Sequence, residues 1–395
     1  MGSEESTVQS APKRGSVLVV LSVLGQPRHA KRIEMLKQTG FDVTAVAFDR
    51  NFHRGRLPDC PVEILGTVYE ARYFQRMILL LRSIFKLRRA LRFKDAIYVF
   101  GADMALLAWI ARGLRSTPIV IEVGDIRDIQ LDQGWRGRVF RHLDRFIMKR
   151  CAMIVSTTSK FVEEYYRKWL GILTLAVIIE NKVEPGLGIG IRALPAISSA
   201  IPNDSQPIRI GYFGLLGCPW AVETLDQLVR RFPQKFQVVL AGFPWPSADL
   251  SRIRSNTAAV SFLGQYKSPA DLPRLYESVD IVWVCYPPIG PNDWNLRWAR
   301  PNRFYESCFF HKPVISRDGS CDAVDVKKFD LGLVIKAVTV DDAVDALQGI
   351  TWEMIARWRD NSSQLPRQIF EYTTEYSDLA IALSGLMSNQ HDRSI

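Results

Sequence analysis

Short apolar runs alternate with amphipathic helical segments twice along this 395-residue chain. The first series extends over residues 16–184 and the second over residues 208–365. Runs such as residues 16–22 (SVLVVLS) are apolar at successive positions, which is typical of parallel strands that helices cover on both faces. The sequence therefore predicts an α/β protein with two doubly wound, Rossmann-like domains.

The chain is also too long for a single hydrophobic core, because domains of about 150 to 200 residues are the usual size. Residues 185–207 are rich in Pro, Gly and Ser and lack a hydrophobic period, so we expect a linker there. Residues 1–15 are polar and are the predicted tail, and residues 366–388 are expected to form a C-terminal helix.

Composition narrows the class of protein. Six scattered cysteines show no metal-ligand spacing, which favours a reduced, cytoplasmic compartment. No apolar stretch approaches the roughly 20 residues that a membrane-spanning helix needs. The formal net charge of +10 is compatible with nucleic acid, an anionic membrane or phosphate-bearing substrates as partners.

Residues 280–319 carry the most specific chemical pattern. An apolar strand leads through a long aromatic loop to a short helix opened by Pro301, and a second strand follows. On that helix Arg303 and Glu306 are three residues apart and project from one face. A guanidinium can bind phosphate oxygens while a carboxylate accepts from a ribose diol, so the pair suits a nucleotide. The alternative is an ordinary surface ion pair.

A glycine-rich loop, residues 211–217 (GYFGLLG), lies where another strand passes into a helix. Gly214 and Gly217 allow backbone N–H groups to approach an anion, and the helix N-terminus adds about half a positive charge. We expect phosphate there, whereas simple turn chemistry is the alternative.

The segment around Arg303 resembles the donor-site signature of GT-B glycosyltransferases of the glycogen synthase-like, group 1 type. Residues 300–306 (RPNRFYE) and 312–315 (KPVI) carry this resemblance, which extends over residues 16 to about 350. It implies two Rossmann-like domains that face a central cleft, with the C-terminal helix returning to the first domain. It also implies that Arg303, beside Asn302, holds the donor diphosphate and that Glu306 holds the ribose.

The same resemblance assigns further donor contacts. It places the nucleobase near Tyr266, which can stack on it, and the diphosphate under the loop of Gly214 and Gly217. Arg300 is a further phosphate candidate, although a solvent-facing role is equally open. The family stabilises the departing diphosphate with cations and helix dipoles, so we expect neither an essential metal nor a cofactor.

The first half is expected to hold the acceptor and any catalytic base. Its carboxylates follow a buried strand, in the order Glu122, Asp125 and Asp128. Asp125 is the preferred base or acceptor ligand, Asp128 the second choice and Glu122 the third. Many relatives have a histidine where this chain has Gly124, which weakens a histidine mechanism. An Asp after a strand is also a common turn former or helix cap.

Residues 72–94 concentrate the positive charge. The cations fall among apolar residues at helical spacing, with no acid, and are Arg72, Arg76, Arg82, Lys86, Arg88, Arg89, Arg92 and Lys94. Such a helix can lie on an anionic membrane surface, which predicts a peripheral enzyme at the inner face of a membrane. The alternative is a helix that packs its apolar face on the sheet. Nucleic acid is not expected, because no stacking platform or recognition fold is evident.

Together these features predict a metal-independent glycosyltransferase that moves a sugar from a UDP- or GDP-sugar to a hydroxyl. The acceptor is expected to be a lipid-linked saccharide or glycolipid in cell-surface polysaccharide assembly. Two alternatives stay open: a nucleotide-sugar epimerase of the same fold, and a non-catalytic nucleotide-sugar-binding scaffold protein.

Overall fold

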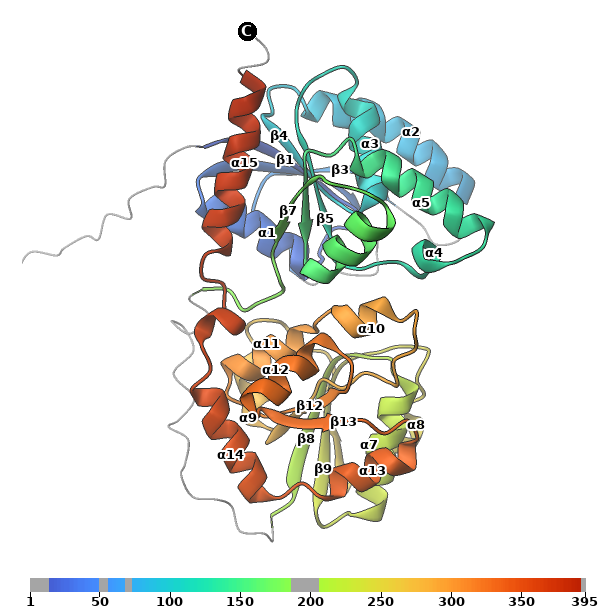
Figure 1. Ribbon diagram of the computed structural model, residues 1–395, viewed down its shortest axis with the longest axis vertical. Coiled ribbons are helices and arrows are strands. Elements are labelled where there is room, and N and C mark those ends of the chain that lie inside the picture. The colour runs from blue at the N-terminus through green and yellow to red at the C-terminus, as the bar shows by residue number, and fades with distance from the viewer. Residues whose placement is uncertain (1–13, 50–55, 68–72, 186–205, 392–395) are drawn as a thin grey trace, which may run out of the picture. The chain divides into compact units, whose positions relative to one another are not determined.

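The computed structural model describes residues 14–49, 56–67, 73–185 and 206–391, and these form two compact units (Figure 1). Unit 1 comprises residues 1–180 and 374–395, and unit 2 comprises residues 181–373. The chain thus passes into unit 2 after Glu180 and returns to unit 1 at Thr374. Most of the predicted linker and tail lies outside the described residues.

Unit 1 contains a seven-stranded sheet in which every pair of neighbours is parallel. In spatial order the strands are β3 (Val62–Thr67), β2 (Phe41–Asp49), β1 (Gly15–Leu21), β4 (Ala96–Phe100), β5 (Ile119–Val123), β6 (Met153–Ser156) and β7 (Leu175–Ile178). The five residues of β4 and the five of β5 are all buried, as expected for strands covered on both faces.

Helices cover this sheet in two groups. They are α1 (Pro27–Gln38), α2 (Tyr73–Ala90), α3 (Ala102–Arg112), α4 (Asp128–Leu131), α5 (Trp135–Met148), the π-helical segment η1 (Phe161–Trp169) and α15 (Glu375–His391). α3 packs between α2 and α5, while α1 packs with α15 (Figure 1). Right-handed crossovers in a parallel sheet account for helices on opposite faces.

Unit 2 repeats the architecture with six parallel strands. In spatial order they are β10 (Val260–Phe262), β9 (Phe236–Pro244), β8 (Ile208–Leu216), β11 (Ile281–Trp283), β12 (Val314–Arg317) and β13 (Gly332–Ile335). The helices are α7 (Pro219–Arg231), α8 (Ser251–Arg254), α9 (Leu272–Glu277), α10 (Trp294–Trp298), α11 (Asn302–Phe309), α12 (Cys321–Phe329), α13 (Val340–Gln348), α14 (Trp352–Ser363) and the 3₁₀ turn η2 (Arg367–Ile369). The predicted pair of doubly wound domains is confirmed.

The predicted helix over residues 366–388 is not continuous. After η2, the backbone of Val183 pairs with Phe370 and Tyr372, which draws this stretch into an extended conformation. The helix α15 begins only at Glu375, and it packs on α1 and β7 within unit 1. The sequence analysis does not predict the strand β3. Its residues are mostly half-exposed, as is typical of an edge strand, so they form no continuous apolar run.

Close contact between β8 and β9 positions the glycine-rich loop. Gly214 lies opposite Gly242 in the sheet, and a Cβ on Gly242 would lie 1.9 Å from the carbonyl oxygen of Gly214. Gly242 also has a φ of +129°, a conformation that L side chains rarely adopt. Only glycine at 242 allows the two backbones to approach in this way.

We predict that Gly242→Ala lowers the unfolding temperature of the protein. A backbone clash together with a strained φ costs about 2–4 kcal/mol. Thermal denaturation measures this effect. The matched control is Gly349→Ala in the same unit, where φ is −73° and the nearest atom to a new Cβ is 3.7 Å away. Equal stability of the Gly242→Ala and Gly349→Ala variants would contradict the need for glycine at position 242.

Candidate functional site

Arg303 and Glu306 lie one turn apart on α11, with Pro301 as its N-cap residue, as the helical spacing predicts. An Nη1–H of Arg303 donates to the carbonyl oxygen of Phe213, at the end of β8. Glu306 accepts a hydrogen bond from the hydroxyl of Tyr276 at 2.7 Å. The Nε of Arg303 is buried and finds no hydrogen-bond partner in the described part of the chain. The guanidinium is thus fixed through its Nη1.

The glycine loop and Tyr266 meet Arg303. A Cβ on Gly214 would lie 3.6 Å from Nη1 of Arg303 and 3.9 Å from the hydroxyl of Tyr266, and Gly214 has a φ of +96°. Burial, and next the charge of Glu306, raises the pKa of Tyr266, so its hydroxyl stays protonated and can donate. Gly214, Tyr266, Arg303 and Glu306 therefore form one cluster in unit 2, which we call the donor cluster.

The other donor-site candidates have different surroundings. Arg300 donates to Asp325 at 2.7 Å and to the carbonyl oxygen of Cys321 at 3.2 Å, which ties the entry of α11 to α12. Asn302 is exposed at the first residue of α11. Gly217 accepts from the hydroxyl of Ser247 through its carbonyl oxygen at 2.6 Å. The structure does not bring these three into the donor cluster.

The start of α7 directly follows the glycine loop. Cys218 is its N-cap residue and accepts from the backbone N–H of Ala221 at 3.4 Å, and Pro219 occupies the first turn. The first turn contains no acidic residue. A helix N-terminus of this kind carries partial positive charge and favours an anion.

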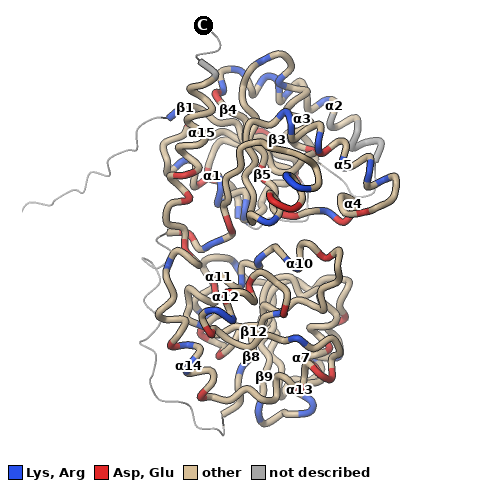
Figure 2. Tube along the Cα trace, in the orientation of Figure 1, with Lys and Arg blue, Asp and Glu red and all other residues tan. Residues whose placement is uncertain are grey.

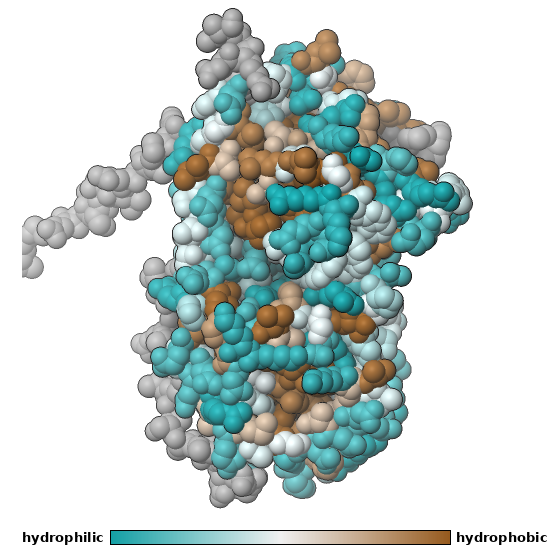
Figure 3. Space-filling view, viewed as in Figure 1, coloured by the Kyte–Doolittle hydropathy of each residue, from teal (hydrophilic) through white to brown (hydrophobic). Residues whose placement is uncertain are grey.

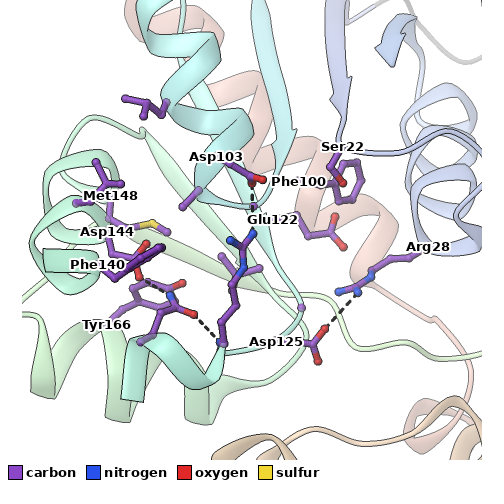
Figure 4. Close-up of a pocket in the computed structure, with 18 of the residues that line it drawn as sticks. Ser22, Arg28, Phe100, Asp103, Glu122, Asp125, Phe140, Asp144, Met148 and Tyr166 are labelled. Atoms are coloured by element: carbon purple, nitrogen blue, oxygen red, sulfur yellow. Dashed lines mark hydrogen bonds and ion pairs between the residues drawn. The ribbon is translucent and has the colours of Figure 1, made fainter. Parts of the chain in front are cut away.

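Unit 1 contains a cavity of about 380 Å³ at the carboxyl ends of β1, β4 and β5 (Figure 4). Polar and apolar residues both line it. The polar ones include Arg28, His29, Asp103, Glu122, Asp125 and Arg127, and the apolar ones include Phe100, Leu106, Phe140, Leu143 and Met148. A cavity with a mixed lining suits a ligand with a polar and an apolar part.

Glu122 is the most deeply buried acid of this lining. Arg32 donates to its two carboxylate oxygens at 2.8 and 3.2 Å, and the hydroxyl of Tyr98 donates at 2.5 Å. Burial opposes ionisation of Glu122, but the charge and hydrogen bonds of Arg32 outweigh it, so the pKa of this carboxyl is lowered. Glu122 is therefore an ionised structural carboxylate rather than a base for proton transfer.

The two preferred catalytic candidates are separated. Asp125 lines the cavity, is 62% exposed and lies 3.6 Å from the guanidinium of Arg28 (Figure 4). Asp128 is the exposed first residue of α4 and is not among the residues that line the cavity. Of these two, only Asp125 faces the cavity.

Two further titratable groups face the same cavity. His29 is buried, its Nδ1 lies 3.2 Å from the carbonyl oxygen of Val23, and burial lowers its pKa to about 4. Burial raises the pKa of Asp144, although hydrogen bonds from Gln130 and Tyr165 oppose this. His29 is thus neutral at physiological pH.

A family model described as "Glycosyl transferase 4-like domain" matches residues 28–178, which lie in unit 1. Over 346 residues, the chain is 28% identical to the succinoglycan biosynthesis protein ExoL of Rhizobium meliloti, covering 85% of this chain and 84% of that protein.

Solved structures establish the fold across both units. Sucrose-phosphate synthase from Thermosynechococcus elongatus aligns with a TM-score of 0.68 at 15% identity, over 95% of this chain and 100% of that one. WaaG, a glycosyltransferase of lipopolysaccharide biosynthesis, aligns with a TM-score of 0.67 at 13% identity, over 93% and 100%. Anabaena HepE in complex with UDP and glucose aligns with a TM-score of 0.64 at 16% identity, over 93% and 99%.

The chain has the fold of the GT-B glycosyltransferases, and its first unit matches a glycosyltransferase family model. The predicted fold, family and enzyme class are confirmed.

Several polar residues of this GT-B glycosyltransferase are missing from the sequence interpretation. Arg28, His29 and Arg32 come from the helix that follows the first strand, and Arg127 comes from the loop after β5. The available signal was position, because residues just after a parallel strand lie at the ligand-binding edge of the sheet. Among the described residues, no group of three or more His, Cys, Asp or Glu side chains could hold a metal ion.

We predict that Arg32→Met destabilises the glycosyltransferase by about 3–5 kcal/mol, because it leaves the buried charge of Glu122 without its cationic partner. Urea denaturation of both proteins measures the loss.

The lowered pKa of Glu122 also makes the stability of the protein depend on pH. The stability contribution of Glu122 is complete above the ordinary carboxyl pKa of 4.5 and is lost as the pH falls through the folded value.

The Glu122→Gln variant should therefore show a shallower loss of stability below pH 4.5 than the parent. Urea denaturation at a series of pH values measures this, with Glu163→Gln on the exposed surface as the control. Parallel pH curves for the parent and Glu122→Gln would contradict an ionised Glu122.

Proposed function

We propose that this GT-B glycosyltransferase takes its sugar from a nucleoside diphosphate donor bound at the donor cluster of unit 2. The observation that carries this proposal is the placement of Arg303 beside Gly214, one turn from Glu306. The guanidinium can bind diphosphate oxygens, and Glu306 can accept from the ribose hydroxyls. Tyr266 adds a hydroxyl donor and an aromatic ring to the same cluster.

The same cluster supports a metal-independent reaction. During transfer the glycosidic bond to the diphosphate breaks, and negative charge develops on the departing phosphate oxygens. Arg303 and the N-terminus of α7 are the groups that stabilise this charge in our proposal. The solved complexes of HepE with UDP and with UDP-glucose favour uridine as the nucleoside, with guanosine as the alternative.

The acceptor is proposed to bind in the cavity of unit 1, with Asp125 as the residue that contacts its hydroxyl. Asp125 reaches the cavity while Glu122 is occupied by Arg32 and Tyr98. Since ExoL is named for succinoglycan biosynthesis, we infer an acceptor that belongs to polysaccharide assembly. The apolar residues in the lining of the cavity favour a lipid-linked saccharide or glycolipid.

Exposed apolar residues on unit 1 support peripheral attachment to an anionic membrane. On the row formed by α2, α3 and α5 these residues are Ile78, Leu81, Phe85, Ile110, Trp135, Val139, Phe140, Leu143 and Phe146, with Leu114 just beyond α3. Exposed cations accompany them, and Figure 2 shows Lys and Arg along α2 and α5. We call this surface the α2–α3–α5 face. Arg72 and the Arg76 side chain lie outside the described residues.

The packing of α2 bears on whether this helix lies on a membrane or only packs its apolar face on the sheet. Ser83 and Leu87 are buried against the unit, but Phe85 is 79% and Leu81 57% exposed. Apolar residues interrupt the polar surface elsewhere too (Figure 3), so exposure alone is not specific. Combined with cations, it fits a helix that lies on a bilayer. None of the helices in the described ranges is long and apolar enough to cross a membrane.

For the donor cluster we predict that Arg303→Ala lowers kcat/KM by about 10²–10³-fold, because a cation that opposes developing charge is removed. Glu306→Gln should weaken nucleoside diphosphate binding about tenfold through the loss of charged hydrogen bonds to the ribose. Nucleoside diphosphate release and calorimetric titration with UDP and GDP measure the two effects.

The matched control for the donor cluster is Arg357→Ala, which removes an exposed arginine of α14 that pairs with Asp330. Turnover should also persist in excess chelator. Unchanged kinetics in both donor-cluster variants would overturn the assignment, and a loss of turnover that a divalent ion restores would overturn metal independence.

For the membrane we predict that the full chain floats with vesicles containing phosphatidylglycerol but not with phosphatidylcholine alone. Charge reversal at Arg88, Arg89 and Arg92 should abolish flotation, since each basic residue near the surface contributes about 1 kcal/mol. The matched control reverses Arg254, Lys267 and Lys328, three exposed cations of unit 2. Flotation that ignores lipid charge, or that both triple variants lose equally, counts against the α2–α3–α5 face.

A further inference from the structure

Gly124 makes room for a guanidinium in the wall of the unit 1 cavity. A Cβ on Gly124 would lie 1.2 Å from Nη1, 2.3 Å from Cζ and 2.8 Å from Nη2 of Arg28. Gly124 is not among the glycines with positive φ, so its backbone conformation does not require glycine. The space that a side chain at position 124 would fill is instead occupied by the head group of Arg28.

The position of Arg28 is not explained by the stability of its own helix. Arg28 lies in the first turn of α1, where the helix dipole disfavours a cation. Its ion pair with Asp125 spans 3.6 Å, and the Asp125 side chain is 62% exposed. Exposed pairs of this length contribute little to stability, so the pair does not account for the guanidinium either.

The other titratable and charged groups that line the cavity have partners of their own or are neutral. Glu122 is bound by Arg32 and Tyr98, and burial raises the pKa of Asp144. Arg127 and Asp103 form a second exposed ion pair at 3.4 Å. His29 is neutral, because burial lowers its pKa to about 4.

A ligand that approaches Arg28 therefore competes mainly with Asp125. This carboxylate comes from an exposed loop position and can turn toward water. Glu122 is the second carboxylate near Arg28, but Arg32 already balances its charge at 2.8 Å. Displacing one exposed carboxylate leaves the guanidinium with donors for a new anion.

We propose that Arg28, whose guanidinium occupies the space beside Gly124, binds an anionic group of the acceptor, a phosphate or a carboxylate. The inference rests on the proposed acceptor role of the unit 1 cavity. The shared chemistry is an oxyanion that accepts hydrogen bonds from two guanidinium nitrogens. The phosphate of a lipid carrier and the carboxylate of an acidic sugar are the two sources that present it.

The test uses the full chain with Arg303→Ala as the parent, so that phosphate binding at the donor cluster is suppressed. Calorimetric titration with inorganic pyrophosphate forms one arm and titration with glucuronate the other. Arg28→Gln should weaken binding of the preferred anion about tenfold, because charged hydrogen bonds are lost. Gly124→Ala should weaken it as well, since the new Cβ excludes the guanidinium from its place.

Asp125→Asn should act in the opposite direction and tighten anion binding, because it removes the competing charge. A purely structural Arg28–Asp125 pair predicts effects of the same sign for both variants. Lys37→Gln is the matched control: it removes one cation from the last turn of the same helix, outside the residues that line the cavity. Its affinity should equal that of the parent.

Arg28-dependent binding of pyrophosphate identifies a carrier phosphate, and Arg28-dependent binding of glucuronate identifies an acidic sugar. Binding of neither anion by the parent, or equal binding by the parent and Arg28→Gln, overturns the proposal. So does weaker binding by Asp125→Asn. These titrations contain no sugar donor, so they are independent of nucleoside diphosphate release by the protein with Arg303 intact, which tests the proposed function.

Discussion

The approach of two glycines across neighbouring strands governs the chemistry of unit 2. Gly214 and Gly242 lie opposite each other where β8 and β9 end, and the backbone separation leaves no space for a Cβ at position 242. This packing exposes the carbonyl oxygen of Phe213 to Arg303 and leaves Gly214 beneath its guanidinium. A larger residue at position 242 would push β8 and β9 apart, and a side chain at position 214 would be strained by its φ of +96°.

The two units treat their carboxylates differently. In unit 2 Glu306 accepts a hydrogen bond from the neutral hydroxyl of Tyr276. In unit 1 Arg32 holds Glu122 bidentately and largely compensates its charge. In our proposal ligand binding in unit 1 therefore depends on the exposed Asp125 and the partly buried Arg28, whose ion pair spans 3.6 Å.

The sequence predicted the fold well because both sheets are parallel and buried, which gives uninterrupted apolar runs such as β4 and β5. It also placed Arg303 and Glu306 correctly on one helical face, since that relation is local. Relations between distant residues were not accessible. The contact of Arg28 with Gly124 joins α1 to the loop after β5, and the bridge of Val183 to Glu371 interrupts the expected terminal helix.

Gly124 illustrates how the absence of a side chain can carry information. From the sequence alone, glycine at this position argued only against a histidine mechanism. In the structure Gly124 leaves space for the guanidinium of Arg28, which comes from α1. The cavity lining thus has a guanidinium where a histidine at position 124 would place an imidazole. Arginine remains protonated at every physiological pH and cannot act as a base, whereas it binds oxyanions well. In our proposal Arg28 therefore recognises acceptor charge, and proton transfer is left to Asp125 or to solvent.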